Sequence, residues 1–271
     1  KKISNSILKI NKIINNNNFQ VIISMIQETN IILGISSIFS KKKILKIGRE
    51  ANTLDKIKSF NYFLRLVYIF IIRLSYNQLD AIISNSLDTK NDLKLLNIKS
   101  KYNINKIIHN PVIDEDNLVY QNKFDFNHKW QNKNFKKILI VGRLVTQKNH
   151  IFCLKVFKKI YLEDKNFRLI ILGDGPLKEN LYKFTVNEKI DHVVDIVGFK
   201  ENVNHYMQFS DLLILTSFYE GFGNVLVEGL YNQMKIISIN CKGGPKEILE
   251  NGKYGTLINE FKEEIFVKEI H

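Results

Sequence analysis

The chain has 271 residues, 45% of them hydrophobic, which suffices for one large or two ordinary domains with buried cores. Its net charge of +13 fits either general solubility or attraction to anions such as nucleotide phosphates and acidic lipid surfaces. The lysines are scattered, without a zinc finger, an RNA-recognition motif or a basic helix, so we expect no nucleic acid partner. Cys153 and Cys241 lie far apart in apolar segments, which favours reduced core residues and a cytoplasmic protein.

The first half of the chain predicts strands and helices in alternation. Expected strands cover Val21–Met25, Lys43–Gly48, Ala81–Ser84 and Lys106–Ile108, and expected helices cover Thr29–Phe39, Tyr62–Tyr76 and Leu87–Leu96. We expect a loop at Asn15–Asn18 and an interdomain linker over the polar residues 112–134. Because the chain begins with Lys1 and shows no signal-peptide pattern, we also expect a fragment whose true start lies upstream.

A short apolar run between Arg65 and Arg73 has two interpretations. It is far shorter than the roughly 20 residues that span a bilayer. The run favours a buried helix, and a patch that faces a membrane surface is the alternative.

The second half alternates more regularly. Expected strands cover Lys136–Val141, Arg168–Leu172, Val193–Val197, Leu212–Leu215 and Lys235–Ile239, and expected helices cover Asn149–Leu162, Pro176–Val186, Val203–Phe209, Asn224–Tyr231 and Lys246–Leu249. Such alternation predicts a parallel sheet that is covered on both faces. Glycine turns follow the strands, and open α/β sheets bind ligands at that edge.

Two pairs of charged residues at these turns, one basic and one acidic, are candidate functional residues. Arg143 and Lys148 follow the first strand of the second half, where fixed cations could stabilise a diphosphate leaving group. Glu220 and Glu228 stand eight positions apart around a Gly-Phe-Gly turn that opens a helix. If the helical rise held throughout, their carboxylates would lie roughly 12 Å apart, which suits the two hydroxyl-bearing ends of a nucleotide sugar. Taken singly, each could be an ordinary loop or helix charge.

Together these segments resemble the retaining GT-B glycosyltransferases of family four. The E-x7-E motif of that family matches Glu220 to Glu228, and its glycine-arginine…lysine segment matches Gly142-Arg143 to Lys148-Asn149. Further matches are Gly173-Asp174-Gly175-Pro176, Val197-Gly198-Phe199, Ser210-Asp211 and Gly243 to Ile248, and weaker ones are Ile47 to Glu50, Asp80 to Ser84 and His109-Asn110-Pro111. The resemblance is strong over residues 136–258 and weaker over residues 20–112.

The resemblance implies an α/β GT-B fold with two Rossmann-like domains facing a cleft. We expect a partial acceptor-side domain with its linker at residues 1–131 and a nucleotide-sugar-binding domain at residues 132–271. It implies a hexose or N-acetylhexosamine donor, usually UDP-linked, transferred with retention to a glycan or lipid-linked acceptor. The catalytic residues it implies are Glu220, Arg143 and Lys148; the donor-binding residues are Gly142, Phe199, Lys200, Gly221, Phe222, Gly223, Asn224, Val225 and Glu228.

Some family features are not found in this sequence. The first strand, the glycine-rich acceptor loop, an upstream histidine and the C-terminal helices after about Phe261 are expected to be missing. No metal cofactor is expected, and Asp114-Glu115-Asp116 matches a D-x-D metal signature only formally, in a polar linker. Two alternative functions stay open: a sugar-nucleotide 2-epimerase and a non-catalytic nucleotide-sugar-binding subunit.

Overall fold

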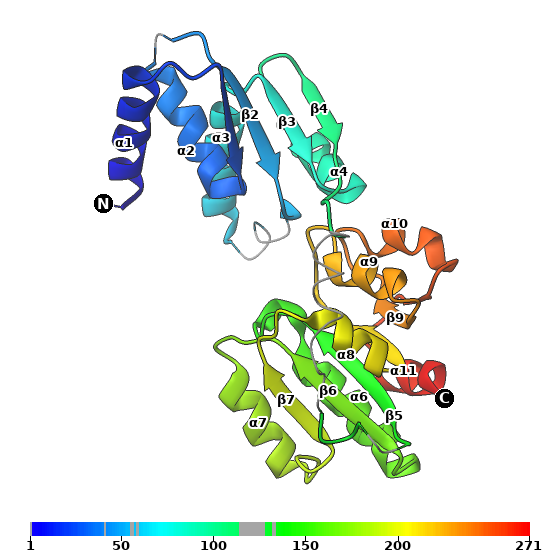
Figure 1. The fold of residues 1–271 in the computed structure, drawn as a ribbon. Coiled ribbons are helices and arrows are strands. Elements are labelled where there is room, and N and C mark those ends of the chain that lie inside the picture. Colours follow the sequence, from blue (N-terminus) through cyan, green and yellow to red (C-terminus); the bar gives the residue numbers. More distant parts are fainter. Residues whose placement is uncertain (1, 41, 55–56, 58–59, 114–127, 132–133) are drawn as a thin grey trace. The chain divides into compact units, whose positions relative to one another are not determined.

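The computed structural model describes residues 2–40, 42–54, 57, 60–113, 128–131 and 134–271. The chain divides into two compact units (Figure 1). The first comprises residues 1–110 together with two short segments, Glu220–Phe222 and Lys242–Gly244, and the second comprises the remainder from Pro111 onward. Residues 128–130, expected in a linker, belong to the second unit, since Trp130 joins its core and His128 hydrogen-bonds Asp195 at 3.0 Å.

The first unit is a four-stranded parallel sheet with packed helices (Figure 1). Its elements are α1 (Lys2–Asn16), β1 (Val21–Met25), α2 (Gln27–Ile38), β2 (Leu45–Glu50), α3 (Tyr62–Tyr76), β3 (Ala81–Ser84), α4 (Leu87–Leu95) and β4 (Ile104–Ile107), with the strands in the order β1-β2-β3-β4. The expected strands and helices of this half are present, with ends shifted by a few residues.

Helix α1 was not predicted, and its last residues occupy part of the expected Asn15–Asn18 loop. Its sequence is rich in asparagine and serine, which have weak helix propensity. Tertiary contacts hold it on α2: Asn11 donates a hydrogen bond to the Ser36 carbonyl at 3.0 Å, and Ser36 donates one to the Ile7 carbonyl at 3.1 Å. Ile14 is buried in the core of this unit.

The second unit is a six-stranded parallel sheet with the order β10-β9-β8-β5-β6-β7. Its strands are β5 (Lys136–Val141), β6 (Phe167–Leu172), β7 (Val194–Gly198), β8 (Leu212–Leu215), β9 (Lys235–Ile239) and β10 (Thr256–Ile258). Its helices are the 3-10 turn η2 (Thr146–Lys148), α6 (His150–Glu163), α7 (Lys178–Asn187), α8 (Val203–Phe209), α9 (Asn224–Tyr231), α10 (Pro245–Ile248), η3 (Glu250–Gly252) and α11 (Glu263–Ile270). The expected elements are present, and β10 and α11 are additions to them.

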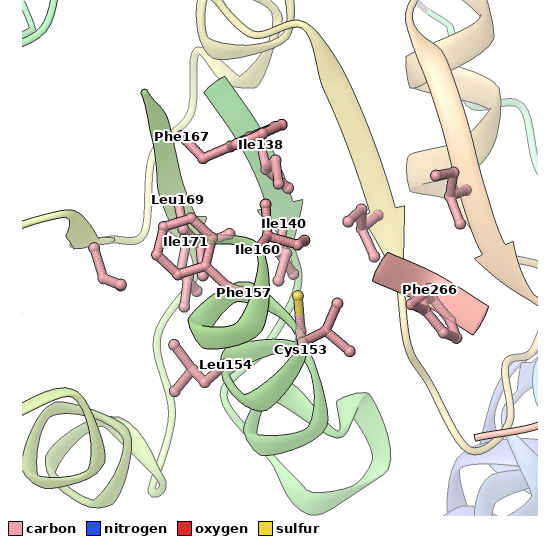
Figure 2. Close-up of a cluster of buried hydrophobic side chains, with 14 of the residues drawn as sticks. Ile138, Ile140, Cys153, Leu154, Phe157, Ile160, Phe167, Leu169, Ile171 and Phe266 are labelled. Carbon is pink, nitrogen blue, oxygen red and sulfur yellow. The ribbon is translucent and has the colours of Figure 1, made fainter. Parts of the chain in front are cut away.

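Alternate residues of the central strands enter two separate cores. Ile138 and Ile140 of β5 pack with α6, where Phe157 fills the space against the sheet (Figure 2). Leu139, between them in sequence, belongs to the core on the other face. Helix α11, in a region where no further helix was expected, places the fully buried Phe266 beside α6 (Figure 2). The sheet is therefore covered on both faces, as its uninterrupted apolar strands predicted.

Candidate active site

The strand order of the second sheet indicates where a ligand would bind. From β5 the chain proceeds outward through β6 and β7, whereas β8, β9 and β10 extend in the opposite direction. The order therefore reverses between β5 and its neighbour β8, and ligands of open α/β sheets bind beyond the carboxyl ends of strands at such a reversal. The two loops that leave this edge are those with the predicted cations and the Gly-Phe-Gly turn.

Hydrogen bonds join these two loops. The Phe218 N–H donates to the Gln147 carbonyl at 2.8 Å, and the Gln147 side-chain amide donates to the Tyr219 carbonyl, also at 2.8 Å. The Thr216 hydroxyl donates to the Lys148 carbonyl at 3.1 Å. The segment with both cations and the segment that leads into Glu220 are thus held as one structure. Sequence reasoning gave Gln147 no role, because its value depends on a partner more than 70 positions away.

The glycine at position 142 leaves room for the Lys148 side chain. A Cβ atom on Gly142 would lie 3.2 Å from Lys148 Cε and 3.3 Å from Cδ. The lysine stem therefore lies against the backbone at the end of β5, and its half-buried position restricts where the ammonium can reach. Arg143, the next residue after the glycine, is exposed. Two cations consequently emerge at the carboxyl end of the strand beside the reversal.

Four predicted residues line one pocket of about 310 Å³ at this edge: Gly142, Arg143, Phe199 and Lys200. The pocket lies at the carboxyl ends of β5, β6 and β7. Its remaining lining residues come from the ends of β5 and β6 and from α8: Val141, Leu172, Gly173, Asp174 and Val203. The exposed Phe199 ring offers an apolar surface in the pocket that Arg143 and Lys200 also line. This size and mixture of apolar walls with a few charges is typical of small-molecule sites.

Asp174 was recognised as part of a turn but not as a pocket residue. The backbone N–H of Gly175 donates a hydrogen bond to its carboxylate at 2.7 Å, and this bond, followed by the nearby Lys178 charge, lowers the pKa of Asp174. A Cβ on Gly173 would lie 1.9 Å from the Gly142 carbonyl oxygen, so the two turns approach each other backbone to backbone. The two glycines of this segment are the sequence feature that indicates such a close approach, because glycine has no side chain to obstruct it.

A larger hollow of about 780 Å³ lies at the opposite edge of the same sheet. Its lining includes the first residues of several strands, among them Lys136, Leu212 and Lys235, and the C-terminal His271. We assign the site to the smaller pocket, because ligands of open α/β sheets bind beyond the carboxyl ends of the strands and the larger hollow lies at the amino ends.

The turn after β8 and the helix α9 that follows it contain most of the predicted donor-binding residues. Glu220 is only 5% exposed, and its backbone N–H donates to the Lys242 carbonyl at 2.8 Å. Gly221 and Phe222 are buried as well. Gly223 has a φ of 94°, a conformation that favours glycine, and it directly precedes the first residue of α9. The backbone therefore changes direction at the glycine that the motif places there.

The assumed helical rise between the two glutamates is wrong. Helix α9 begins at Asn224, so the four residues from Glu220 to Gly223 form a turn rather than a helix. The glycine conformation at position 223 prevents a helix from continuing through the motif. The helical rise therefore gives no distance between these two carboxylates.

Glu228 lies within α9, four positions after the exposed Asn224, so the two share one face of the helix. It is half-buried, and burial raises the pKa of its carboxyl group. Val225 of the same helix is buried in the core. A half-buried acid at this place can accept hydrogen bonds from hydroxyl groups with little competition from water.

His150 is a second buried titratable residue near the cations. It is the first residue of α6, is 1% exposed, and neither ring nitrogen has a hydrogen-bond partner among the described residues. Burial, together with the nearby Lys148 charge, lowers the pKa of His150 to about 4. The imidazole is therefore neutral at physiological pH, and it adds no further charge next to Lys148.

Two of the weaker predicted segments meet in the first unit, where the Arg49 guanidinium donates a hydrogen bond to the Asn110 side chain. In the described residues, no group of three or more histidine, cysteine or acidic side chains is arranged to hold a metal ion. Asp114-Glu115-Asp116 lies outside the described residues. Both cysteines are buried, as expected. Among the described helices, none combines the length and hydrophobicity needed to cross a bilayer.

Comparison with known proteins identifies the class of protein to which this fold and loop arrangement belong. The structure of Anabaena HepE in complex with UDP and glucose matches with a TM-score of 0.76 at 16% identity, over 99% of this chain and 70% of that chain. The chain thus has the α/β GT-B fold with parallel sheets. It belongs to the glycosyl transferases group 1 family, whose model matches residues 121–271.

Two relatives extend the similarity beyond the second unit. An uncharacterized glycosyltransferase of Methanocaldococcus jannaschii is 27% identical over 100% of this chain and 71% of that protein. The N-acetylgalactosamine-N,N'-diacetylbacillosaminyl-diphospho-undecaprenol 4-alpha-N-acetylgalactosaminyltransferase of Campylobacter jejuni is 29% identical over 93% of this chain and 66% of that protein. The chain thus spans about two thirds of the length of these relatives.

Proposed function

We propose that the whole protein is a retaining glycosyltransferase of cell-envelope polysaccharide biosynthesis. It transfers a hexose or N-acetylhexosamine from a UDP-linked sugar to a glycan or lipid-linked acceptor in the cytoplasm. One observation carries this proposal: two cations and a glycine turn before a helix leave neighbouring strands at the reversal of the sheet, in loops that hydrogen-bond each other. The UDP and glucose in complex with HepE and the undecaprenol in the name of the Campylobacter relative support the donor and acceptor classes.

In this proposal the chain's own charges stabilise the leaving group. Negative charge grows on the diphosphate as its bond to the sugar breaks, and Arg143 and Lys148 are the cations that would counter it. The N–H groups at the start of α9 add a positive end of a helix dipole. With these groups in place, the reaction requires no metal at the donor site. Retention would follow from attack on the face from which the phosphate departs.

The remaining predicted residues would orient the donor. Glu220 and the turn at Gly221–Asn224 would hold the transferred sugar and the adjoining phosphate, and Glu228 would accept hydrogen bonds from the ribose hydroxyls. Phe199 and Lys200 would border the base in the 310 Å³ pocket. A pocket lined by an exposed aromatic ring and apolar strand ends suits a flat heterocycle.

The test compares three variants of the whole protein in sugar-transfer and donor-binding assays. Arg143→Ala and Glu228→Gln are each expected to lower transfer by at least about tenfold, in the range reported for lost transition-state contacts. Lys155→Ala removes an exposed cation on α6 outside the loop and should leave transfer unchanged. Wild-type rates in both site variants would contradict the assigned roles.

The same assay separates the alternative functions. A 2-epimerase would convert the nucleotide sugar without any acceptor, so product in an acceptor-free reaction would favour it. A non-catalytic subunit would bind the nucleotide sugar and turn over none of the acceptors in a panel. Acceptor-dependent release of UDP is the result that the proposal requires.

A further inference from the structure

Helix α3 has two apolar faces, and only one of them is used by the fold. Ile69, Ile72 and Tyr76 point into the core of the first unit. The opposite side carries a second stripe of large apolar side chains, all exposed: Phe63, Leu66, Val67, Phe70 and Leu74. Their spacing of three and four residues puts them on one side of the helix. The sequence interpretation as a buried helix therefore holds for one face only.

We call these five side chains the outer face of α3. The exposed fractions of its two phenylalanines are 71% for Phe63 and 65% for Phe70. Single exposed apolar residues are common on soluble proteins, but a contiguous stripe of five is a sign of an interaction surface.

The charges that helix α3 itself carries are all positive. Helix α3 contains Arg65 and Arg73, both exposed, and no acidic residue. The Arg73 Nε donates a hydrogen bond to the Leu96 carbonyl at 2.8 Å, which brings the end of α4 beside the end of α3. At that end Leu95 is 81% exposed and Lys94 is exposed. An apolar stripe with Arg73 and Lys94 at its C-terminal end complements an anionic lipid surface.

A second exposed apolar surface, on β1, is a poorer candidate for lipid contact. Val21, Ile23 and Met25 are exposed on one face of the sheet, and β1 is its edge strand. An edge strand carries backbone groups that a hydrocarbon environment cannot satisfy. In α3 those groups are bonded within the helix, and its 15 residues are too few to span a bilayer but sufficient to lie in its interface.

We propose that the outer face of α3 docks this protein on an anionic membrane surface, with the phenylalanines inserted among the lipids and the basic residues against the headgroups. The biological purpose rests on the proposed function, because docking would bring the enzyme to an acceptor that is anchored in the membrane. The docking itself requires neither the donor nor the acceptor.

The test measures binding of the whole protein to sedimented vesicles of phosphatidylcholine, with and without phosphatidylglycerol. Wild-type protein is expected to bind the anionic vesicles and to dissociate as salt is raised. The double substitution Phe63→Ser with Phe70→Ser should weaken binding by at least about tenfold, because two large apolar side chains no longer insert. Lys94→Gln should weaken binding by about fivefold, from the loss of one charge near the surface.

A matched control replaces two exposed apolar side chains of the second unit, Leu162→Ser with Tyr182→Ser, and should bind vesicles as the wild type does. Calorimetric binding of UDP-sugar, measured in parallel on all variants, should be unchanged. Donor binding without vesicle binding would overturn docking alone, and vesicle binding without donor binding would overturn the proposed function alone.

Two further outcomes would overturn the proposal. Equal vesicle binding by the wild type and the Phe63/Phe70 double variant would show that another surface makes the contact. A wild-type dimer that the double substitution turns into a monomer, by analytical ultracentrifugation, would show that a second copy of the chain covers this face. Thermal unfolding of each variant checks that the substitutions at exposed positions have left the fold intact.

Discussion

The two parallel sheets of this protein are buried in different ways. In the second unit, alternate residues of β5 and β6 enter cores on opposite faces, so Ile138 and Leu139 are both buried. In the first unit, side chains on one face of β1 are covered while Ile23 and Met25 on the other are exposed. Parallel topology by itself therefore does not determine how much of a sheet is covered.

The covered face of the first sheet is also unusually polar. Ser24 and Glu50 point to that side, where Ser24 donates a hydrogen bond to Asn30 at 2.6 Å and Tyr76 donates one to the Glu50 carboxylate. Asn30 in turn donates to the Tyr76 hydroxyl at 3.1 Å. In the second unit, the strand residues buried against the helices are aliphatic instead, such as Ile138 and Ile140. We therefore expect the two units to respond differently to core truncation and to pH.

The largest effect is expected in the core of the second unit. Phe157 is 1% exposed and packs between α6 and the sheet (Figure 2). Phe157→Ala should lower the free energy of unfolding by about 3–5 kcal/mol, since it removes a large apolar group and leaves a cavity. Urea denaturation followed by circular dichroism measures the change. A loss below about 1 kcal/mol would mean that this core collapses around the space.

A slightly smaller effect, a few kcal/mol, is expected from Glu50. Burial raises the pKa of Glu50 to about 8, against an unfolded value near 4.5, so between these values the folded state binds more protons than the unfolded state. The free energy of unfolding should therefore fall as pH rises from about 4.5 to 8. Glu50→Gln keeps the shape without the charge and should flatten this dependence. An unchanged pH profile in the variant would assign the slope to other groups.

The second unit should show a weaker dependence of opposite sign. The pKa of His150 is lowered to about 4, so below its unfolded value of 6.5 the unfolded state binds more protons. Stability should therefore fall as pH decreases from about 6.5 to 4, by about 2–3 kcal/mol. Hydrogen exchange of amides in α6, compared between wild type and His150→Gln across this pH range, measures the loss of stability. If stability depended equally on pH in both proteins, His150 would not be the cause of the dependence.

The smallest effect is expected on the exposed face of the first sheet. Ile23 is 54% exposed, so Ile23→Ala should change the free energy of unfolding by no more than about 0.5 kcal/mol. Thermal denaturation of the 271-residue chain provides the measurement. A loss comparable to that of Phe157→Ala would indicate that this face is covered in solution, and the contrast between the two sheets would disappear.

The sequence by itself determined the alternation of strands and helices and the place of the glycine turns. Strand β8 and helix α9 were predicted with their exact bounds, because a buried apolar strand, a glycine turn and an apolar-periodic helix are local patterns. The same locality explains why Arg143 and Gly223 could be selected as candidates without coordinates.

Only the tertiary structure decided which distant residues meet. Helix α1 forms from a sequence of low propensity because α2 provides its partners, and Gln147 gains its role only from the loop after β8. The two faces of α3 look equally apolar in sequence, and packing alone buries Ile72 and leaves Phe70 exposed. Hydrogen bonds and burial between segments far apart in the chain depend on its path in space, which no local pattern specifies.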